Sequence, residues 1–187
     1  RLAGSDYPMD TKFLTLSAVL KKQEASPDLL ANRTGSSHDY SRRQLMQTAP
    51  NIVHGDWKTY QHEAERVRAM VFIAEQKVPR ELEFDEDDKT AEHFISFDAR
   101  HMVTGCARLL DNGRIGRVAV LRPFRGRGIG EAVMKTVLER AKARGMKDVH
   151  LAAQVQAMPF YERLGFEPFG DEFDEAGIPH RMMRLVF

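Results

Sequence analysis

The chain has 187 residues, of which 42% are hydrophobic and 29% are charged, a composition that suits one folded domain with a sizeable core. Its formal net charge of +1 gives no reason to expect nucleic acid or a membrane surface as a partner, and no apolar run approaches the ~20 residues of a spanning helix. The single cysteine, Cys106, excludes an internal disulfide framework and a cysteine-based metal site. We therefore expect a soluble, cytoplasmic protein.

Residues 1–50 differ in composition from the rest of the chain, because Ser, Thr, Asn, Gly and Pro recur and apolar residues become rare after Leu30. Residues 12–25 have apolar side chains at helical spacing and predict one helix. Residues 26–50 read as a linker that cannot bury itself. We expect an N-terminal extension over 1–50, partly helical or disordered, and one domain over 51–187.

The domain begins with a short strand over 52–54, and Asp56 then caps a helix that runs from Trp57 to about Gln76. Residues 77–91 are expected to form a loop with an acidic cluster. The cluster lacks the glycine and the final glutamate of a calcium-binding EF-hand. Two interpretations stay open: a patch that steers a cationic amine, and a plain solvated loop. Its acidic residues are Glu83, Asp85, Glu86, Asp87 and Asp88.

Three strands follow, over 91–99, 101–110 and 114–121. The turn between the second and the third contains Asn112-Gly113, a pair that accepts the positive φ angles of a type I′ hairpin turn.

The stretch Arg125-Gly126-Arg127-Gly128-Ile129-Gly130 comes next, between that third strand and a long amphipathic helix that ends at Gly145. Its glycines leave backbone amides uncovered where a helix begins, and such amides bind phosphate. The two arginines add cations that can pair with phosphate oxygens. The stretch is neither a dinucleotide fingerprint nor a P-loop, because the required sixth glycine and the Gly-Lys-Ser/Thr ending are absent.

The rest of the chain predicts a strand over 149–155, a short helix over 159–164, and strands near Phe166 and over 182–186. The order is strand, helix, three strands, helix, strand, helix and closing strands. It indicates a mixed α/β (α+β) fold with a largely antiparallel sheet and one crossover around the long helix.

These landmarks together resemble the GNAT family of N-acetyltransferases. The resemblance rests on the Arg-x-x-Gly-x-Gly loop, on the segment from Ala157 to Phe166 and on the C-terminal strand. Residues 71–76, His93 and residues 175–180 look like the ElaA-type branch of that family. The similarity covers residues 52–187 and implies the GNAT fold, with a central pair of strands that splay apart and helices that flank them.

The resemblance implies an N-acetyltransferase that takes acetyl-CoA as its donor and moves the acetyl group directly to a primary amine. Backbone groups along the bulged strand before the loop would bind the pantetheine arm, and an amide there would polarise the thioester oxygen, an effect worth on the order of 10²–10³ in rate. The loop would bind the pyrophosphate, and Gln154 would contact cofactor or acceptor. The implied cofactor-binding residues are Val118, Ala119, Val120, Arg125, Gly126, Arg127, Gly128, Ile129, Gly130 and Gln154.

By the same resemblance, Tyr161 is the candidate acid for the departing thiolate, since a phenol with a pKa of about 10 is protonated at neutral pH. The base stays open among Glu75, His93 and His180. Cys106 makes a poor acyl carrier, and the scattered histidines offer no metal-ligand pair. The rival function is a non-catalytic acyl-CoA sensor. The acceptor is expected to be a small-molecule or peptide amine, and a homodimer is left open.

Overall fold

The structure is a computed structural model that describes residues 49–187. The helix expected over 12–25 and nearly all of the linker expected over 26–50 lie outside the described residues. The strands are β1 (Asn51–Gly55), β2 (Glu92–Phe97), β3 (Val103–Leu109), β4 (Ile115–Val120), β5 (Asp148–Gln154), β6 (Glu167–Glu175) and β7 (Ile178–Val186). The α-helices are α2 (Trp57–Arg68), α3 (Arg80–Glu83), α4 (Ile129–Ala143) and α5 (Met158–Glu162). A π-helical segment, η1 (Ala69–Glu75), and three 3₁₀ turns, η2 (Glu86–Lys89), η3 (Arg122–Phe124) and η4 (Val155–Ala157), complete the order.

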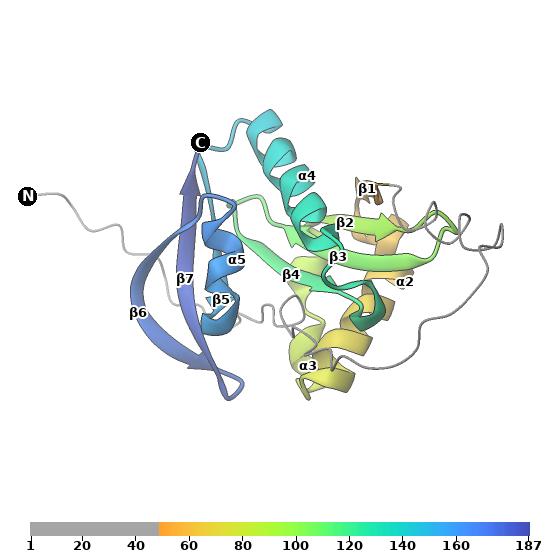
Figure 1. Ribbon diagram of the computed structural model, residues 1–187, viewed down its shortest axis with the longest axis horizontal. Helices are drawn as coiled ribbons and strands as arrows, with labels where there is room; N and C mark the ends of the chain where they lie inside the picture. Colours follow the sequence, from red (N-terminus) through yellow and green to blue (C-terminus); the bar gives the residue numbers. More distant parts are fainter. Residues whose placement is uncertain (1–48) are drawn as a thin grey trace, which may run out of the picture.

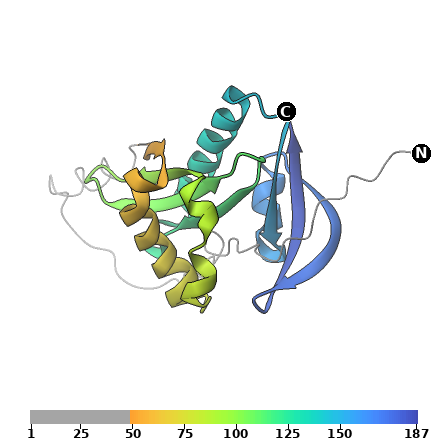
Figure 2. The same ribbon diagram turned by 180° about the vertical axis from the view of Figure 1, so that it is seen from behind.

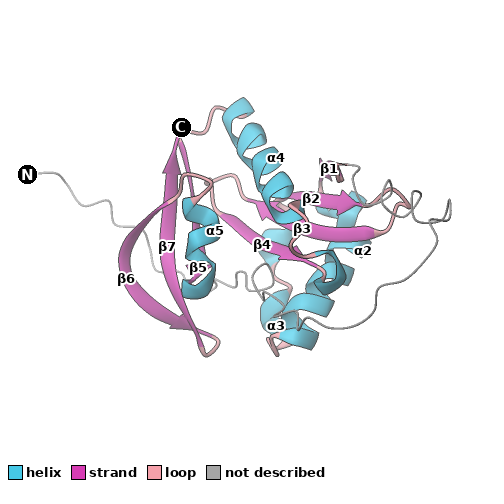
Figure 3. Ribbon diagram, viewed as in Figure 1, coloured by secondary structure: helices cyan, strands magenta, loops and turns pink. Residues whose placement is uncertain are grey.

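The strands form two antiparallel sheets that meet edge to edge. One has the order β1-β2-β3-β4 and the other the order β5-β7-β6. The two edge strands β4 and β5 are joined by one parallel bridge, between Arg114 and His150, and then diverge (Figure 3). The expected mixed fold, mostly antiparallel with a splayed central pair, is therefore confirmed.

Helices cover both faces of the first sheet. Figure 1 shows α4 in front of the sheet, and Figure 2, from behind, shows α2 on the opposite face. The alternation of β4 follows this layering: Val118 and Val120 belong to the core beneath α4, whereas Ala119 belongs to the core beneath α2. Since successive side chains of a strand point to opposite faces, a sheet covered on both faces needs an unbroken apolar run. The sequence supplies that run at residues 118–120 of β4.

The first long helix begins where the sequence predicts. The Asp56 side chain accepts a hydrogen bond from the backbone amide of Thr59 at 2.8 Å, as an N-cap does. The expected helix from Trp57 to Gln76 changes its hydrogen bonding after Arg68, because residues 69–75 form η1. π-Helical turns inside helices are often found at functional sites.

The hairpin turns differ from the expectation in one respect. The connection between β3 and β4 is not a type I′ turn, because only Gly113 has a positive φ, 82°, and Asn112 does not. The amide of Gly113 donates to the carbonyl of Leu110, and that of Leu110 to the carbonyl of Arg114, which closes a three-residue loop with glycine in the left-handed position. Two consecutive positive φ angles occur instead at Ala176 and Gly177, between β6 and β7.

Three of the five carboxylates in the acidic stretch belong neither to a solvated loop nor to a steering patch. It contains α3 and η2, and Glu83, Asp85 and Asp88 are buried or nearly so, with side chains 0%, 8% and 2% exposed. Both open interpretations are therefore wrong for these residues. Glu86 is exposed, and the side chain of Asp87 is 43% exposed. Sequence reasoning failed here because the arginines that neutralise the buried carboxylates come from distant segments.

Candidate functional site

The glycine loop has a left-handed backbone at two of its three glycines. Gly126 and Gly128 have φ angles of 73° and 77°, and a Cβ atom built at either position would meet no atom within 4 Å. Gly128 is the N-cap of α4, and no side chain among residues 49–187 caps the helix. The first amides of α4 therefore lie at the positive end of the helix dipole without a side-chain cap from that part of the chain. Ile129 and Gly130, expected to bind cofactor as well, are buried in this first turn.

The two arginines of the loop are placed differently from each other. Arg127 is exposed, and its guanidinium lies 5.8 Å from the ring centre of Phe124. Arg125 donates from Nε to the carbonyl oxygen of Val120 at 2.9 Å and from Nη2 to Glu75 at 2.8 Å. Arg125 thus ties the loop to β4 and to η1, whereas Arg127 forms no ion pair with any of residues 49–187.

The edge of β4 beside the loop carries a bulge. Arg108 pairs with Gly116 but Cys106 pairs with Ala119, so β4 holds one extra residue opposite β3. Arg117 lies at the extra position with a φ of 53°, the left-handed region that glycine usually fills in such a bulge. Beyond it, β4 runs as an edge strand facing β5, and Val118, Ala119 and Val120 are fully buried. The resemblance predicted a bulged strand here, and the structure has one.

A buried ion network holds the bulge in place. The guanidinium of Arg117 lies 2.9 Å from Asp85 and 3.2 Å from Glu83. Burial lowers the pKa of Arg117 to about 10, against the attraction of Glu83. Arg108 binds Asp85 at 2.6 Å and Asp88 at 2.7 Å. Burial opposes the ionisation of Asp88, but its bonds to Arg68 and Arg108 outweigh burial and lower its pKa.

Arg68 completes the network from α2. It lies 2.6 Å from Glu83 and 2.7 Å from Asp88, and it also donates to the backbone carbonyl of Glu83. Three arginines and three carboxylates therefore link α2, the α3–η2 segment, β3 and β4. Such a network fixes the position of the bulge relative to its surroundings.

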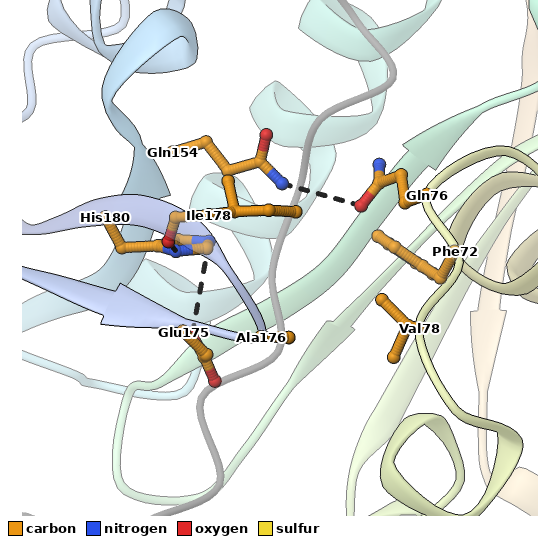
Figure 4. A pocket seen from close by; sticks show the side chains of 8 residues that line it. All are labelled: Phe72, Gln76, Val78, Gln154, Glu175, Ala176, Ile178 and His180. Atoms are coloured by element: carbon orange, nitrogen blue, oxygen red, sulfur yellow. Dashed lines mark hydrogen bonds and ion pairs between the residues drawn. The ribbon is translucent and has the colours of Figure 1, made fainter.

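A pocket lies where β4 and β5 have separated, between the end of η1 and the β6–β7 hairpin (Figure 4). Apolar side chains from the η1 side and from β7 form part of its wall, and amide, carboxylate and imidazole groups form the rest. Gln154 Nε2 lies 3.5 Å from Gln76 Oε1 across the pocket. The lining residues are Phe72, Gln76, Val78, Gln154, Glu175, Ala176, Ile178 and His180.

His180, one of the three candidate bases, lines this pocket. Its Nδ1 lies 2.8 Å from the carbonyl oxygen of Ile178, and its Nε2 lies 4.0 Å from Oε2 of Glu175. Burial raises the pKa of Glu175 to about 7, although Arg117 and Arg114 attract its carboxylate. Glu175 therefore changes charge near neutral pH, as a general base should.

The other two candidate bases lie elsewhere. Glu75 does not line the pocket; its carboxylate forms the ion pair with Arg125. His93 is buried on β2, with its ring 4.8 Å from that of Trp57 and Nε2 2.9 Å from the backbone oxygen of Asp88. Burial lowers the pKa of His93, against that hydrogen bond. The structure thus brings His180 and Gln154 together and separates them from Glu75 and His93.

Tyr161 lies in α5 with its ring edge-on to Phe160 and Phe166, at centroid distances of 5.0 and 5.8 Å. It is fully buried and does not line the pocket. Burial raises the pKa of the phenol above its ordinary value, so the hydroxyl keeps its proton at neutral pH. Cys106 is also buried, and burial raises the pKa of its thiol to about 12.

Two further observations concern residues 49–187 only. No group of three or more His, Cys, Asp or Glu side chains there is placed to hold a metal ion. No helix in that range is long and apolar enough to cross a membrane.

Sequence reasoning missed three residues that the structure brings to the site: Gln76, Arg117 and Glu175. Gln76 and Glu175 stand within segments that carried the family resemblance, but no role was predicted for them. The signal was weak, because a glutamate at a hairpin turn is ordinarily solvated. For Arg117 the useful hint was a basic residue within an otherwise apolar strand.

Comparison with known proteins agrees with this geometry. The sequence profile of the acetyltransferase (GNAT) domain family matches residues 57–187. The uncharacterized N-acetyltransferase YjcF of Bacillus subtilis is 39% identical over 120 residues, which cover 63% of this chain and 86% of YjcF. Protein ElaA of Escherichia coli is 33% identical over 124 residues, covering 62% of this chain and 80% of ElaA.

Solved structures give the same result. The crystal structure of Escherichia coli ElaA has a TM-score of 0.66 and 27% identity, covering 73% of this chain and 99% of ElaA. An acyl-CoA N-acyltransferase from Pseudomonas aeruginosa has a TM-score of 0.67 and 26% identity, covering 74% of this chain and all of that one, 100%. The resemblance to the ElaA-type branch is thereby confirmed. With the family profile spanning the domain and the glycine loop, bulged β4 and splayed strands in place, the chain belongs to the GNAT family of acetyltransferases and is an acyltransferase.

Proposed function

We propose that the protein is an acetyl-CoA-dependent N-acetyltransferase, and that the pocket between η1 and the β6–β7 hairpin receives a primary amine. The observation that carries this proposal is the uncapped start of α4, where Gly126 and Gly128 leave open space above a helix N-terminus. A pyrophosphate suits this place because amides and the helix dipole favour an anion. When bound, acetyl-CoA supplies the acetyl group as a thioester.

The residues of the chain would hold the donor in two places. Loop amides around Gly126, Gly128 and Gly130 and the side chain of Arg127 would bind the pyrophosphate. The edge of β4 that faces β5, at Val118–Val120, would bind the pantetheine arm in the manner of an added strand. Arg125, committed to Glu75 and to the Val120 carbonyl, would keep the loop in register with that edge.

Direct transfer needs no acyl-enzyme. The amine nitrogen bonds to the acetyl carbon, the carbon–sulfur bond breaks, and the nitrogen loses two protons in all. One leaves the ammonium before attack, and the other balances the proton that Tyr161 donates to the sulfur. Cys106 is not a nucleophile in this scheme, because burial holds its thiol protonated.

The donor site is tested by two glycine variants of α4. Gly128 and Gly145 have φ angles of 77° and 75°, and both have open space where a Cβ would project. Alanine at either position should cost about 1–2 kcal/mol of stability, from the left-handed backbone. Only Gly128→Ala should weaken coenzyme A binding in calorimetry, by about tenfold or more, the equivalent of 1.4 kcal/mol. Equal affinities for the two variants would place the cofactor elsewhere.

Transfer itself is tested by release of coenzyme A from acetyl-CoA, with polyamines, amino sugars, amino acids and peptides offered in turn. We expect turnover with at least one class of amine. Binding of coenzyme A without turnover on any of them would favour the non-catalytic sensor instead.

A further inference from the structure

Two polar atoms of the pocket are buried without a hydrogen-bond partner among residues 49–187. One is Gln76 Nε2, a donor, and the other is Glu175 Oε2, an acceptor. They approach from different walls, Gln76 just after η1 and Glu175 from the last residue of β6 (Figure 4). Buried polar groups in folded proteins nearly always have a partner. A donor and an acceptor left over in one pocket indicate a ligand that offers the complementary pair.

The imidazole of His180, which lies beside Glu175, indicates which chemical group the ligand must offer to the carboxylate. His180 Nδ1 faces the Ile178 carbonyl, which only accepts, so the proton of the neutral ring stays on Nδ1. Nε2 is then an acceptor, and it points at the carboxylate from 4.0 Å. An acceptor nitrogen cannot satisfy the Glu175 oxygen, which therefore still lacks a donor among residues 49–187, and an ammonium group offers three N–H donors and a positive charge.

The charged groups around Glu175 come from several elements. Arg117 of β4 and Arg114 just before β4 attract its carboxylate, Glu83 of α3 repels it, and His180 of β7 faces it. Burial outweighs the two arginines and sets the pKa of Glu175 at about 7. An ammonium in the pocket would meet a carboxylate able to take its proton and later release it to water.

We propose that Glu175 is the general base of the transfer, with the acceptor ammonium bound by Glu175 and an oxygen of the same acceptor bound by Gln76. The proposal rests on the proposed acetyltransferase function. In the step, an N–H bond of the ammonium breaks and an O–H bond forms on Glu175, and the freed amine lone pair attacks. The carboxylic acid then returns its proton to water. The acceptor class is a primary amine with a nearby carbonyl or hydroxyl oxygen on a small apolar body, which Phe72, Val78 and Ile178 would contact.

The base is tested with Glu175→Gln, with Glu172→Gln as the matched control from the exposed part of the same strand. For the wild type, kcat/KM should fall about tenfold per pH unit below pH 7, because protonated Glu175 cannot accept a proton. Glu175→Gln should lower kcat/KM on the order of 10²-fold or more and abolish this acidic limb. Glu172→Gln should keep both the rate and the limb.

A second readout does not depend on turnover. The folded-state pKa of Glu175 lies above the ordinary glutamate value, so the native protein binds the extra proton and its stability falls as pH rises from about 4.5 through 7. Glu175→Gln should therefore unfold at a higher temperature than the wild type at pH 8 and at a similar temperature at pH 5. A lower midpoint for the variant at pH 8 would show that the carboxylate is a structural partner and overturn the proposal.

The outcomes separate this inference from the proposed function. Wild-type turnover with an unchanged acidic limb in Glu175→Gln would overturn the base and leave the acetyltransferase intact. A wild type that acetylates no amine would overturn both. For Gln76→Met, the preference for an amino alcohol over the alkylamine of equal length should fall several-fold. An unchanged preference would contradict the oxygen contact.

Discussion

The ring of Tyr161 packs in the core, whereas its hydroxyl group carries the chemistry proposed for it. A variant that lacks only the hydroxyl oxygen therefore separates the two roles. The Tyr161 ring packs against Phe160 and Phe166, contacts that phenylalanine would keep. Tyr161→Phe should therefore leave the unfolding temperature and coenzyme A affinity nearly unchanged. The rate constant kcat should fall on the order of 10²-fold, because the proton donor to the thiolate is lost. A variant with full kcat in steady-state assays would reduce Tyr161 to a core residue.

The three candidate bases show that residue type alone cannot decide which side chain acts as the general base. Glu75, His93 and His180 all have side chains of a type that can accept a proton, and each stood at a sequence position that favoured it. Their surroundings differ: Glu75 is paired with Arg125, His93 lies against Trp57, and His180 faces the pocket. The role of each remains a prediction, but only His180 shares a pocket with the unpaired Glu175 oxygen. These partners are far apart in the chain, so no local pattern could have ranked the three.

At the scale of elements, the bulge of β4 is a strained feature held by the ion network around it. A non-glycine residue in the left-handed region costs roughly 1–2 kcal/mol, and Arg117 occupies that region with its guanidinium bound to Asp85 and Glu83. The network therefore keeps an irregular strand edge in one conformation. It also explains why an acidic stretch that looks solvated in the sequence is buried.

Loss of one carboxylate from this network should be costly. Asp85→Asn removes the charge that faces both Arg108 and Arg117, and breaking a buried ion pair costs about 3–5 kcal/mol. The neighbouring Asp87 is the control, because it is 43% exposed and lies 3.8 Å from Arg108 and 3.6 Å from Arg114. Asp87→Asn should cost at most about 1 kcal/mol. Urea unfolding measures both, and similar losses would show that the network contributes little.

For the whole molecule, we propose that the function lies at the wedge between the two sheets. The sheets share one bridge, between Arg114 and His150, and the proposed donor site lies along the edge of one sheet and the start of α4. A ligand that binds only the folded state at 100 times its Kd should add about 2.7 kcal/mol to stability. We expect coenzyme A to raise the unfolding temperature accordingly, in calorimetry. Gly128→Ala should show a much smaller rise at the same concentration, and no rise in the wild type would contradict the site.

The sequence predicted most elements of the domain, since their signals are local. The N-cap at Asp56, the stripe of α4 and the strand periodicities correspond to the observed elements. The sequence was wrong about the type I′ turn at Asn112-Gly113, because only Gly113 has a positive φ. The same two residues are compatible with both hairpin geometries, so the sequence could not distinguish between them. It also missed α3 and η2, whose short helical turns are stabilised by the buried network rather than by periodicity.

The glycine loop, its position between a strand and a helix, and the order of elements were determined by the sequence alone, and they identify the family and imply the donor that we propose. The conformational freedom of the glycines and the unbonded amides at the helix start both follow from the residue types at one place in the chain. They can therefore be predicted without knowledge of the tertiary structure. The tertiary structure decided which carboxylates are buried and which meet a partner. Glu83, Asp85 and Asp88 bind arginines from three distant segments, whereas Glu175 lies in a partly apolar pocket beside an acceptor nitrogen of His180. The environment of a charge is a property of everything packed around it, and for that reason the proposed base appears only in the folded protein.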